Sequence, residues 1–251
     1  MILIIAMTAL WLFIAGVIVC LTLTAKVSVA ERKIPVYRVV TDEKKAALTF
    51  NCAWDDSTTD EILNILDREN VRCTFFFVGD YARKYPEDVR KIVNAGHEPA
   101  NHSDRHISPS KQSFSSLAAD ISSCNDEIKT LTGRTCRLYR APSGEYTNDA
   151  ISAAESLGMT TVQWNVDSID WRNKAPAEIL ERIKTKTVGG SIILFHTGKQ
   201  NTADALPAVI ELLKKSGYEL VTVSELLPDG EYDILHDGAA KRHRQPSADG
   251  E

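Results

Sequence analysis

Seven short apolar runs typical of β-strands alternate with amphipathic stretches of helical period along most of this 251-residue chain. The helical stretches carry the usual end signals: Thr58 and Glu61 form a capping box, and Gly133 follows the last residue of an apolar stripe. This alternation predicts an α/β fold with a parallel sheet. The number of units favours a distorted (β/α) barrel of about seven strand–helix units over an open sheet. The expected strands are residues 46–51, 73–78, 97–101, 137–139, 160–164, 191–195 and 219–223.

Reactive polar residues directly follow five of these strands. Chemistry in (β/α) barrels gathers at the carboxyl ends of the strands, so this placement predicts one common site. The residues are those of 51–56 and 102–106, then Arg140, those of 167–170, and His196.

A metal site is one interpretation of the histidines. His102 and His106 are four residues apart, and on a helical turn they would share one face, as a divalent metal requires. Alone, most such pairs are surface histidines. Asp55 or Asp56, from another strand end, would complete the ligand set, although both also suit a helix N-cap. His196 ends a buried strand and is, taken alone, more often a core histidine.

The N-terminus predicts a membrane segment. Residues 1–24 carry no charged side chain and would form a helix about 36 Å long, enough to span a hydrocarbon core of about 30 Å. A cleaved signal peptide is the alternative. Basic residues follow the run, which by the positive-inside rule favours a cytoplasmic remainder. We expect segment 1–25 as anchor or signal, 26–45 as a connector, 46–228 as the main domain and 229–251 as a disordered tail.

Charge and cysteines exclude some classes. With 34 acidic and 29 basic residues the net charge is −5, and no basic block exceeds 241–244, so we expect no nucleic-acid partner. No C-x-x-C pair occurs, which excludes a zinc ribbon or thioredoxin motif. Buried thiols are the favoured state of the cysteines outside the apolar run, with Cys52 and Cys73 the candidate pair if they are oxidised.

Five motifs, taken together, resemble those of the polysaccharide deacetylases, the NodB-homology family of carbohydrate esterases. The similarity covers roughly residues 46–226, and the Ala-Trp inside the first motif is most similar to the sporulation-type branch that acts on bacterial cell wall. The motifs are TFNCAWDD (49–56), NHSDRH (101–106), RAPSG (140–144), DSIDW (167–171) and LFH (194–196).

The resemblance implies a metal-dependent N-deacetylase of peptidoglycan or a related N-acetylglucosamine polymer, facing the outside of the cell. His102, His106 and Asp56 would bind a divalent metal, with zinc the first choice and cobalt, nickel or iron the others. His196 would be the general acid, with its pKa tuned by Asp170. The remaining implied roles are a base-orienting Arg140 and an oxyanion-binding main-chain N–H of Ser143.

Asn51 departs from the family, whose members have a general-base aspartate there. A carboxamide cannot accept a proton at neutral pH. Asp55 as a substitute base, or unaided metal-bound hydroxide, would keep the enzyme active. The alternative hypothesis is a catalytically impaired protein that binds glycan or acts as a scaffold. A third is a cytoplasmic amide hydrolase. Oligomeric state is open.

Overall fold

The computed structural model describes residues 7, 10–11, 14 and 31–243. The described residues from 33 to 243 belong to one compact unit. No helix among the described residues is long and apolar enough to cross a membrane. The predicted membrane segment lies almost wholly outside the described residues.

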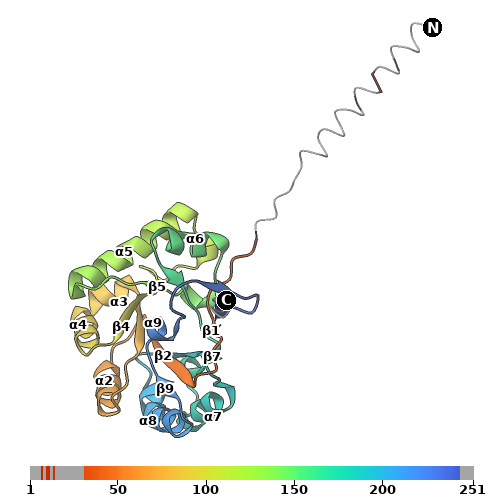
Figure 1. Cartoon of the computed structure of the whole chain (residues 1–251). Coiled ribbons are helices and arrows are strands. Elements are labelled where there is room, and N and C mark those ends of the chain that lie inside the picture. Colours follow the sequence, from red (N-terminus) through yellow and green to blue (C-terminus); the bar gives the residue numbers. More distant parts are fainter. Residues whose placement is uncertain (1–6, 8–9, 12–13, 15–30, 244–251) are drawn as a thin grey trace, which may run out of the picture. The chain divides into compact units, whose positions relative to one another are not determined.

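A parallel sheet forms the centre of the unit (Figure 1). β2 (Lys45–Cys52) lies between β8 (Ser191–His196) and β3 (Thr74–Phe77), each parallel to it. The sheet continues in parallel through β4 (Glu98–Asn101) and β5 (Leu138–Tyr139). It then reaches the remaining strand of this series, β6 (Thr160–Thr161). The predicted parallel α/β sheet is confirmed.

The segment around β1 (Arg38–Val39) links the two ends of this sheet. Arg38 pairs in antiparallel fashion with Ser191 of β8, and Val36 forms a parallel bridge with Val162, just after β6. The strand–helix units therefore close into a distorted barrel. Two short strands add to it: β7 (Val166–Asp167) pairs with β8 and β9 (Glu219–Leu220) with β2.

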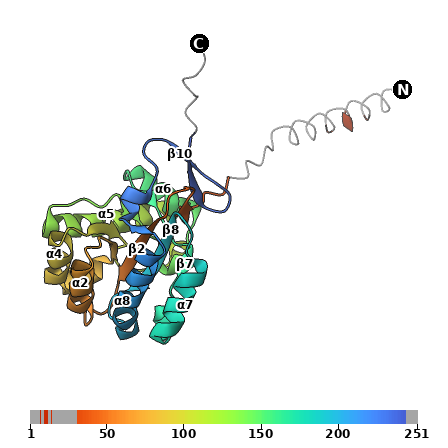
Figure 2. The ribbon, with the colours of Figure 1, turned by 60° about the horizontal axis from the view of Figure 1, so that its bottom comes forward.

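Helices cover the outer face of the sheet (Figure 2). Side chains alternate along each strand, so β2 directs Leu48 and Phe50 to the helices and Ala47 into the barrel. The helices on this face are α2 (Thr59–Arg68), α3 (Gly79–Lys84), α4 (Pro86–Asn94), α5 (Phe114–Thr132), α6 (Asn148–Ser156), α7 (Pro176–Lys186) and α8 (Gln200–Lys215). The short α9 (Val223–Leu226) instead packs against the interior cluster that contains Ala47.

The predicted ends of the domain need correction. The expected disordered tail is wrong up to residue 243, because β10 (Tyr232–Ile234) and β11 (Ala239–Arg242) form an antiparallel hairpin there. β11 also pairs in parallel with β1, so residues 33–45 belong to the domain and are no connector. β10 is an edge strand, and exposed polar side chains such as Asp233, Lys241 and Arg242 are why the composition of this hairpin is like that of a tail.

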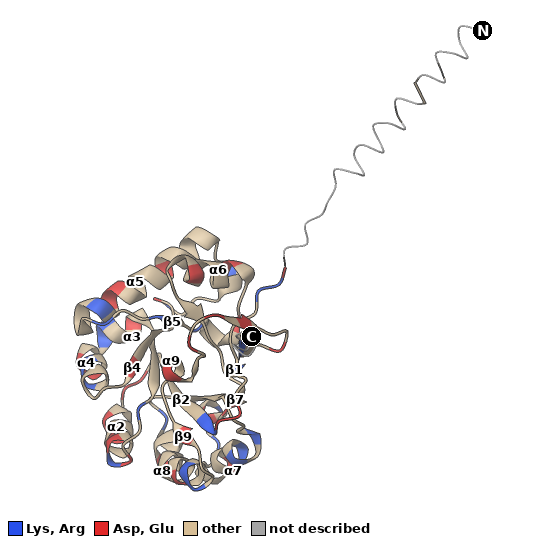
Figure 3. Cartoon of the chain, viewed as in Figure 1, with Lys and Arg blue, Asp and Glu red and all other residues tan. Residues whose placement is uncertain are grey.

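The charged side chains form no large basic block and the thiols are buried, as the sequence predicts for the described residues. Acidic and basic side chains are interspersed over the helices (Figure 3). Cys52, Cys73, Cys124 and Cys136 are buried free thiols, so the Cys52–Cys73 alternative is not adopted.

Candidate functional site

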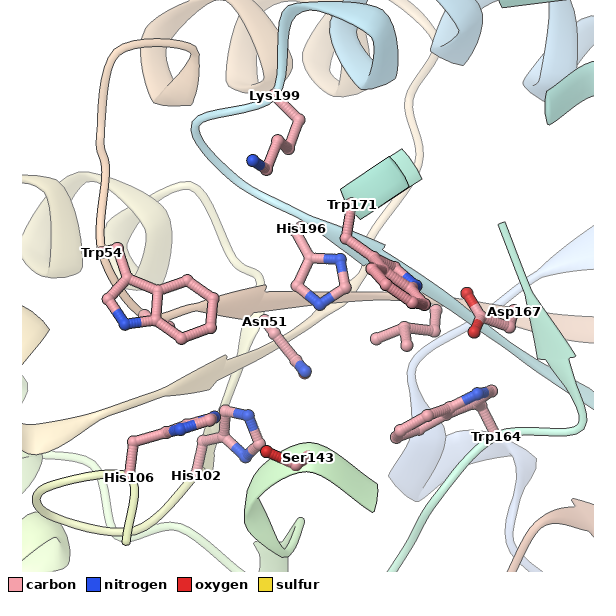
Figure 4. Close-up of a pocket in the computed structure, with 12 residues that line it drawn as sticks. Asn51, Trp54, His102, His106, Ser143, Trp164, Asp167, Trp171, His196 and Lys199 are labelled. Atoms are coloured by element: carbon pink, nitrogen blue, oxygen red, sulfur yellow. The ribbon is translucent and has the colours of Figure 1, made fainter. Parts of the chain in front are cut away.

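A pocket of about 470 Å³ opens where β2, β4 and β8 end (Figure 4). Its wall contains both predicted histidine groups and five aromatic or apolar side chains to which the sequence analysis assigned no role. The lining residues are Asn51, Ala53, Trp54, His102, His106, Ser143, Trp164, Asp167, Trp171, Leu194, His196 and Lys199.

His102 and His106 meet at the floor of the pocket, as predicted, but by a different local geometry. The segment after β4 is a loop and not a helical turn. Ser103 and His106 take left-handed backbone angles, with φ of 70° and 54°, and this brings the ring centroids within 4.9 Å. His102 Nδ1 lies 2.8 Å from the carbonyl of Arg140. Burial lowers the pKa of His102 well below its ordinary value, and the neighbouring His106 adds to this.

The predicted carboxylate ligands do not join these histidines. Asp55 Oδ1 accepts a hydrogen bond from the main-chain N–H of Ser57 at 2.9 Å, and the side chain is exposed. Asp56 lies beside Asp88 of α4. Burial raises the pKa of Asp88; Lys91 opposes this, and Asp56 adds to it. Neither Asp55 nor Asp56 lines the pocket.

The donor set therefore does not fit a divalent metal held by three protein ligands. Members of this family generally depend on such a metal. Within residues 31–243, no group of three His, Cys, Asp or Glu side chains is placed to hold one. Two imidazoles remain, where structural and catalytic zinc sites use at least three protein ligands. Asp56 as the third ligand is not supported.

Arg140 and Asn51 form a buried pair that lacks a carboxylate. Arg140 is 0% exposed, and its Nη1 donates to Asn51 Oδ1 at 2.8 Å. Its Nη2 donates to Thr49 Oγ1 at 3.0 Å and to the carbonyl of Gln163 at 3.1 Å. Burial lowers the pKa of Arg140 well below its ordinary value. No acidic side chain of the described residues pairs with this guanidinium, so its charge is uncompensated.

The same bond fixes what Asn51 offers to a ligand. Because Oδ1 accepts from Arg140, the amide nitrogen is left to point into the pocket (Figure 4). An NH₂ group is only a donor. At the place where the family has its base, this chain presents a hydrogen-bond donor.

His196 and Asp170 form the second buried pair, and here the carboxylate is present. His196 Nδ1 lies 2.8 Å from Asp170 Oδ1, and the His196 main-chain N–H donates to Oδ2 at 2.7 Å. Thr202 Oγ1 also donates to Oδ2, at 2.6 Å. Burial raises the pKa of Asp170, but the bonds from His196 and Thr202 outweigh it and lower the pKa below the ordinary value. The predicted pairing of these two residues is confirmed, and it leaves His196 Nε2 toward the pocket.

Strained backbone gathers around the pocket. Ser143 has φ of 57°, and the β-branched Ile169 has φ of 56°. The main-chain N–H of Ile169 donates to Asp167 Oδ1 at 2.7 Å, which holds this conformation. Left-handed angles outside glycine cost about 1–3 kcal/mol each and cluster at functional sites. Ser143 thus lies at the pocket as predicted, with its main chain in an unusual conformation.

Three tryptophans form walls that sequence reasoning did not assign. Trp54 is 65% exposed, and its ring meets His106 edge-on at 5.1 Å. Trp164 and Trp171 line the opposite end beside Asp167 (Figure 4). Trp54 and Trp171 each lie within a quoted motif, and that adjacency was the available signal. Lys199, just after the last motif, carried no such signal.

Comparison with known proteins agrees with this architecture. The family model for polysaccharide deacetylase matches residues 38–162. A peptidoglycan-N-acetylglucosamine deacetylase of Bacillus cereus is 33% identical over 197 residues, covering 76% of this chain and 92% of that protein. The chain belongs to the polysaccharide deacetylase family.

Two further relatives bear on catalysis. Uncharacterized protein YlxY of Bacillus subtilis is 33% identical over 195 residues, which cover 78% of this chain but 61% of that longer protein. The crystal structure of wild-type BA3943 from Bacillus anthracis, described as a CE4 family pseudoenzyme, has a TM-score of 0.75 and 31% identity, covering 84% of this chain and 73% of that one. A mutant of BA3943 described as having restored enzymatic activity has the same TM-score and 32% identity, covering 77% and 71%.

Proposed function

We propose that this chain binds N-acetylated cell-wall glycan without hydrolysing it. The observation that carries the proposal is the 2.8 Å bond from Arg140 to Asn51 Oδ1, which turns the Asn51 amide nitrogen toward the pocket. A group that only donates there cannot accept a proton from an attacking water.

No carboxylate of the described residues takes over the task from the position that Asn51 occupies. Asp170 already accepts from His196 and Thr202, and Asp55 is turned to its own loop. Asp167 lies at the far end, beside Trp164. General-base catalysis is worth about 10²–10⁴ in rate, so its loss alone removes most turnover. The described residues supply two histidines and no third ligand, so the proposed function involves no metal.

Glycan binding requires no general base, and the pocket contains the aromatic and polar side chains that binding requires. Tryptophan faces provide large apolar surfaces at both ends of the pocket, and polar groups between them can fix orientation. The relatives named as peptidoglycan deacetylases suggest the ligand class, and the relative described as a pseudoenzyme supports loss of turnover. The proposed ligand is therefore peptidoglycan or a related N-acetylglucosamine polymer.

Metal-dependent deacetylation is the second candidate, favoured by the intact His196–Asp170 pair. That pair would hold a proton at Nε2 for a departing sugar amine. The Ser143 main chain would serve as the oxyanion donor. This candidate requires a carboxylate to move into the pocket, and Asp55 is the one on an exposed loop.

We place the site of action outside the cell, with residues 1–24 as the membrane anchor or signal. The support is the uncharged apolar run together with the location of the proposed ligand. Protease digestion of intact cells tests it: an external domain is degraded, and a protected domain contradicts the proposal.

The functional test is acetate release measured beside binding. We expect the purified full-length chain to bind chitotetraose and peptidoglycan fragments in calorimetry while releasing no acetate above the protein-free blank. The Bacillus cereus deacetylase serves as positive control for the assay. Acetate release by the wild type that disappears in His196→Ala would contradict the proposal and establish the second candidate.

A further inference from the structure

One end of the pocket combines an aromatic face with an unpaired cation. Trp54 and Lys199 both lie there, beside His196 (Figure 4). Lys199 is half-buried, and its Nζ has no hydrogen bond or ion pair with any residue in the described part of the chain. Many surface lysines do pair, such as Lys91 with Asp60 at 2.7 Å. A lysine that lines a pocket without a partner is available to a ligand.

The two loops that carry Trp54 and Lys199 are fixed to each other. The Thr197 main-chain N–H donates to the carbonyl of Asn51 at 3.1 Å, and the Gly198 N–H donates to Thr58 Oγ1 at 2.9 Å. Gly198 has φ of 71°, and a Cβ there would lie 2.5 Å from Asp55 Cβ. Close backbone packing therefore holds the two loops, from which Trp54 and Lys199 project, in one arrangement.

Acidic side chains near this end are engaged elsewhere. Asp55 Oδ1 accepts from Ser57, and Asp170 accepts from His196 and Thr202. Asp167 lies at the opposite end of the pocket. The buried Arg140 behind Asn51 also lacks a carboxylate. The Lys199 ammonium consequently has no carboxylate partner among the described residues, and Asp170 is held behind His196 by its own donors.

We propose that the end of the pocket formed by Trp54 and Lys199 binds the carboxylate of an acidic N-acetyl sugar. Lys199 pairs with the carboxylate, and the ring of Trp54 packs on the apolar face of the sugar. The inference rests on the proposed function and narrows its ligand: a glycan unit that carries both an acetamide and a carboxylate, of the muramic-acid type, is preferred over neutral N-acetylglucosamine.

The carboxylate has two sources in such a glycan. It belongs to the lactyl group when no peptide is attached, and to the peptide when the lactyl group is amidated. Calorimetry with the full-length chain separates them by using three tetrasaccharides: one with free lactyl groups, one with peptides attached, and neutral chitotetraose.

We expect the lactyl tetrasaccharide to bind about tenfold more tightly than chitotetraose, as one charge-assisted bond of about 1.4 kcal/mol allows. The preference should shrink with added salt, because the pair is partly exposed. Lys199→Gln should remove the preference, Lys199→Arg should retain most of it, and Lys186→Gln, at the far end of α7, should leave it unchanged. Tighter binding of the peptide form identifies the peptide carboxylate as the source.

Other results overturn the inference. Equal affinity of the wild type for acidic and neutral tetrasaccharides contradicts it while leaving the proposed function intact. A preference that survives in Lys199→Gln also contradicts it. Failure to bind any of the three glycans removes the proposed function as well, so the two failures are distinguishable.

Discussion

Two buried polar pairs meet at one pocket, where Asn51 of β2 and His196 of β8 are neighbours, and only one of the pairs contains a carboxylate. His196 faces Asp170, whose carboxylate accepts three hydrogen bonds. Arg140 faces Asn51, whose carboxamide accepts one from it. Both Arg140 and Asp170 are 0% exposed. In the first pair the protein's own donors satisfy a buried carboxylate, whereas in the second a buried guanidinium has no anionic partner among the described residues.

The difference shows that the hydrogen-bonded geometry of a buried polar pair can persist when its charge has no counterion. Arg140 keeps its side-chain bonds through Thr49, the carbonyl of Gln163 and the ring of Phe76, 3.8 Å away. These contacts hold the guanidinium in place but do not neutralise it. A ligand that brings a carboxylate then gains from both Lys199 and the field of Arg140.

Removing the carboxylate of the His196–Asp170 pair should have the largest effect on the free energy of unfolding. Asp170→Asn leaves the donors of His196 and Thr202 facing a neutral amide, and removing one partner of a buried charged pair costs about 3–5 kcal/mol. Urea unfolding at pH 7 measures the loss. Asp167→Asn is the matched control, because Asp167 is half-exposed and its Oδ1 accepts a main-chain hydrogen bond from Ile169. Equal losses in both variants would show that the Asp170 pair is not special.

Giving Arg140 a carboxylate partner should have the next largest effect, and it should raise the free energy of unfolding. Asn51→Asp gives Arg140 an anion in direct contact, and we expect a gain of about 3 kcal/mol in the free energy of unfolding. Asn125→Asp is the control, since Asn125 contacts Asn101 and Met159 and no arginine. A loss of stability in Asn51→Asp would mean that the charge of Arg140 is already balanced.

A pH series separates these pairs from other titrating groups. Burial lowers the pKa of His97 from 6.5 to about 4, with Arg72 adding to it. The unfolded chain therefore binds a proton first, and stability present above pH 6.5 is lost as the pH falls toward 4, by about 2 kcal/mol at pH 5. His97→Gln should flatten this decline in urea midpoints.

The same pH series also isolates the contribution of the His196–Asp170 pair to stability. The Asp170 pKa is lowered below 3.8, so its stabilisation is complete above that pH and is lost only as the pH falls through the lower folded value. The stability difference between wild type and Asp170→Asn should stay constant from pH 6.5 to 4. A difference that shrinks within that window would assign the decline to Asp170 and not to His97.

The sequence predicted those features that depend on local pattern. The strand–helix alternation predicts the parallel sheet, and residues at or just after strand ends meet at one pocket, as Asn51, His102 and His196 show. A position directly after a strand is enough to predict that these residues meet, because the carboxyl ends of parallel strands lie at the same edge of the sheet.

Features set by distant partners could not be predicted. Whether Asp56 turns to His102 or to Asp88 depends on where α4 packs. The pairing of β11 with β1 joins opposite ends of the domain, and nothing in the local composition indicates it. The contact of Trp54 with His106 likewise depends on left-handed angles at Ser103 and His106, residues that do not favour them by type alone.

The pairing of β1 with β11 also constrains the order of folding. Arg38 meets Ala239, so the last strand contact of the barrel joins residues from the two ends of the domain. Closing so long a loop costs entropy before the contact returns any energy, and it requires that the whole domain has been synthesised. The parallel strands from β2 to β6 lie close together in sequence and can pair earlier. We therefore expect the part of the pocket wall that β2 to β6 carry to assemble first and the barrel to close last, with β1 and the terminal hairpin completing it together.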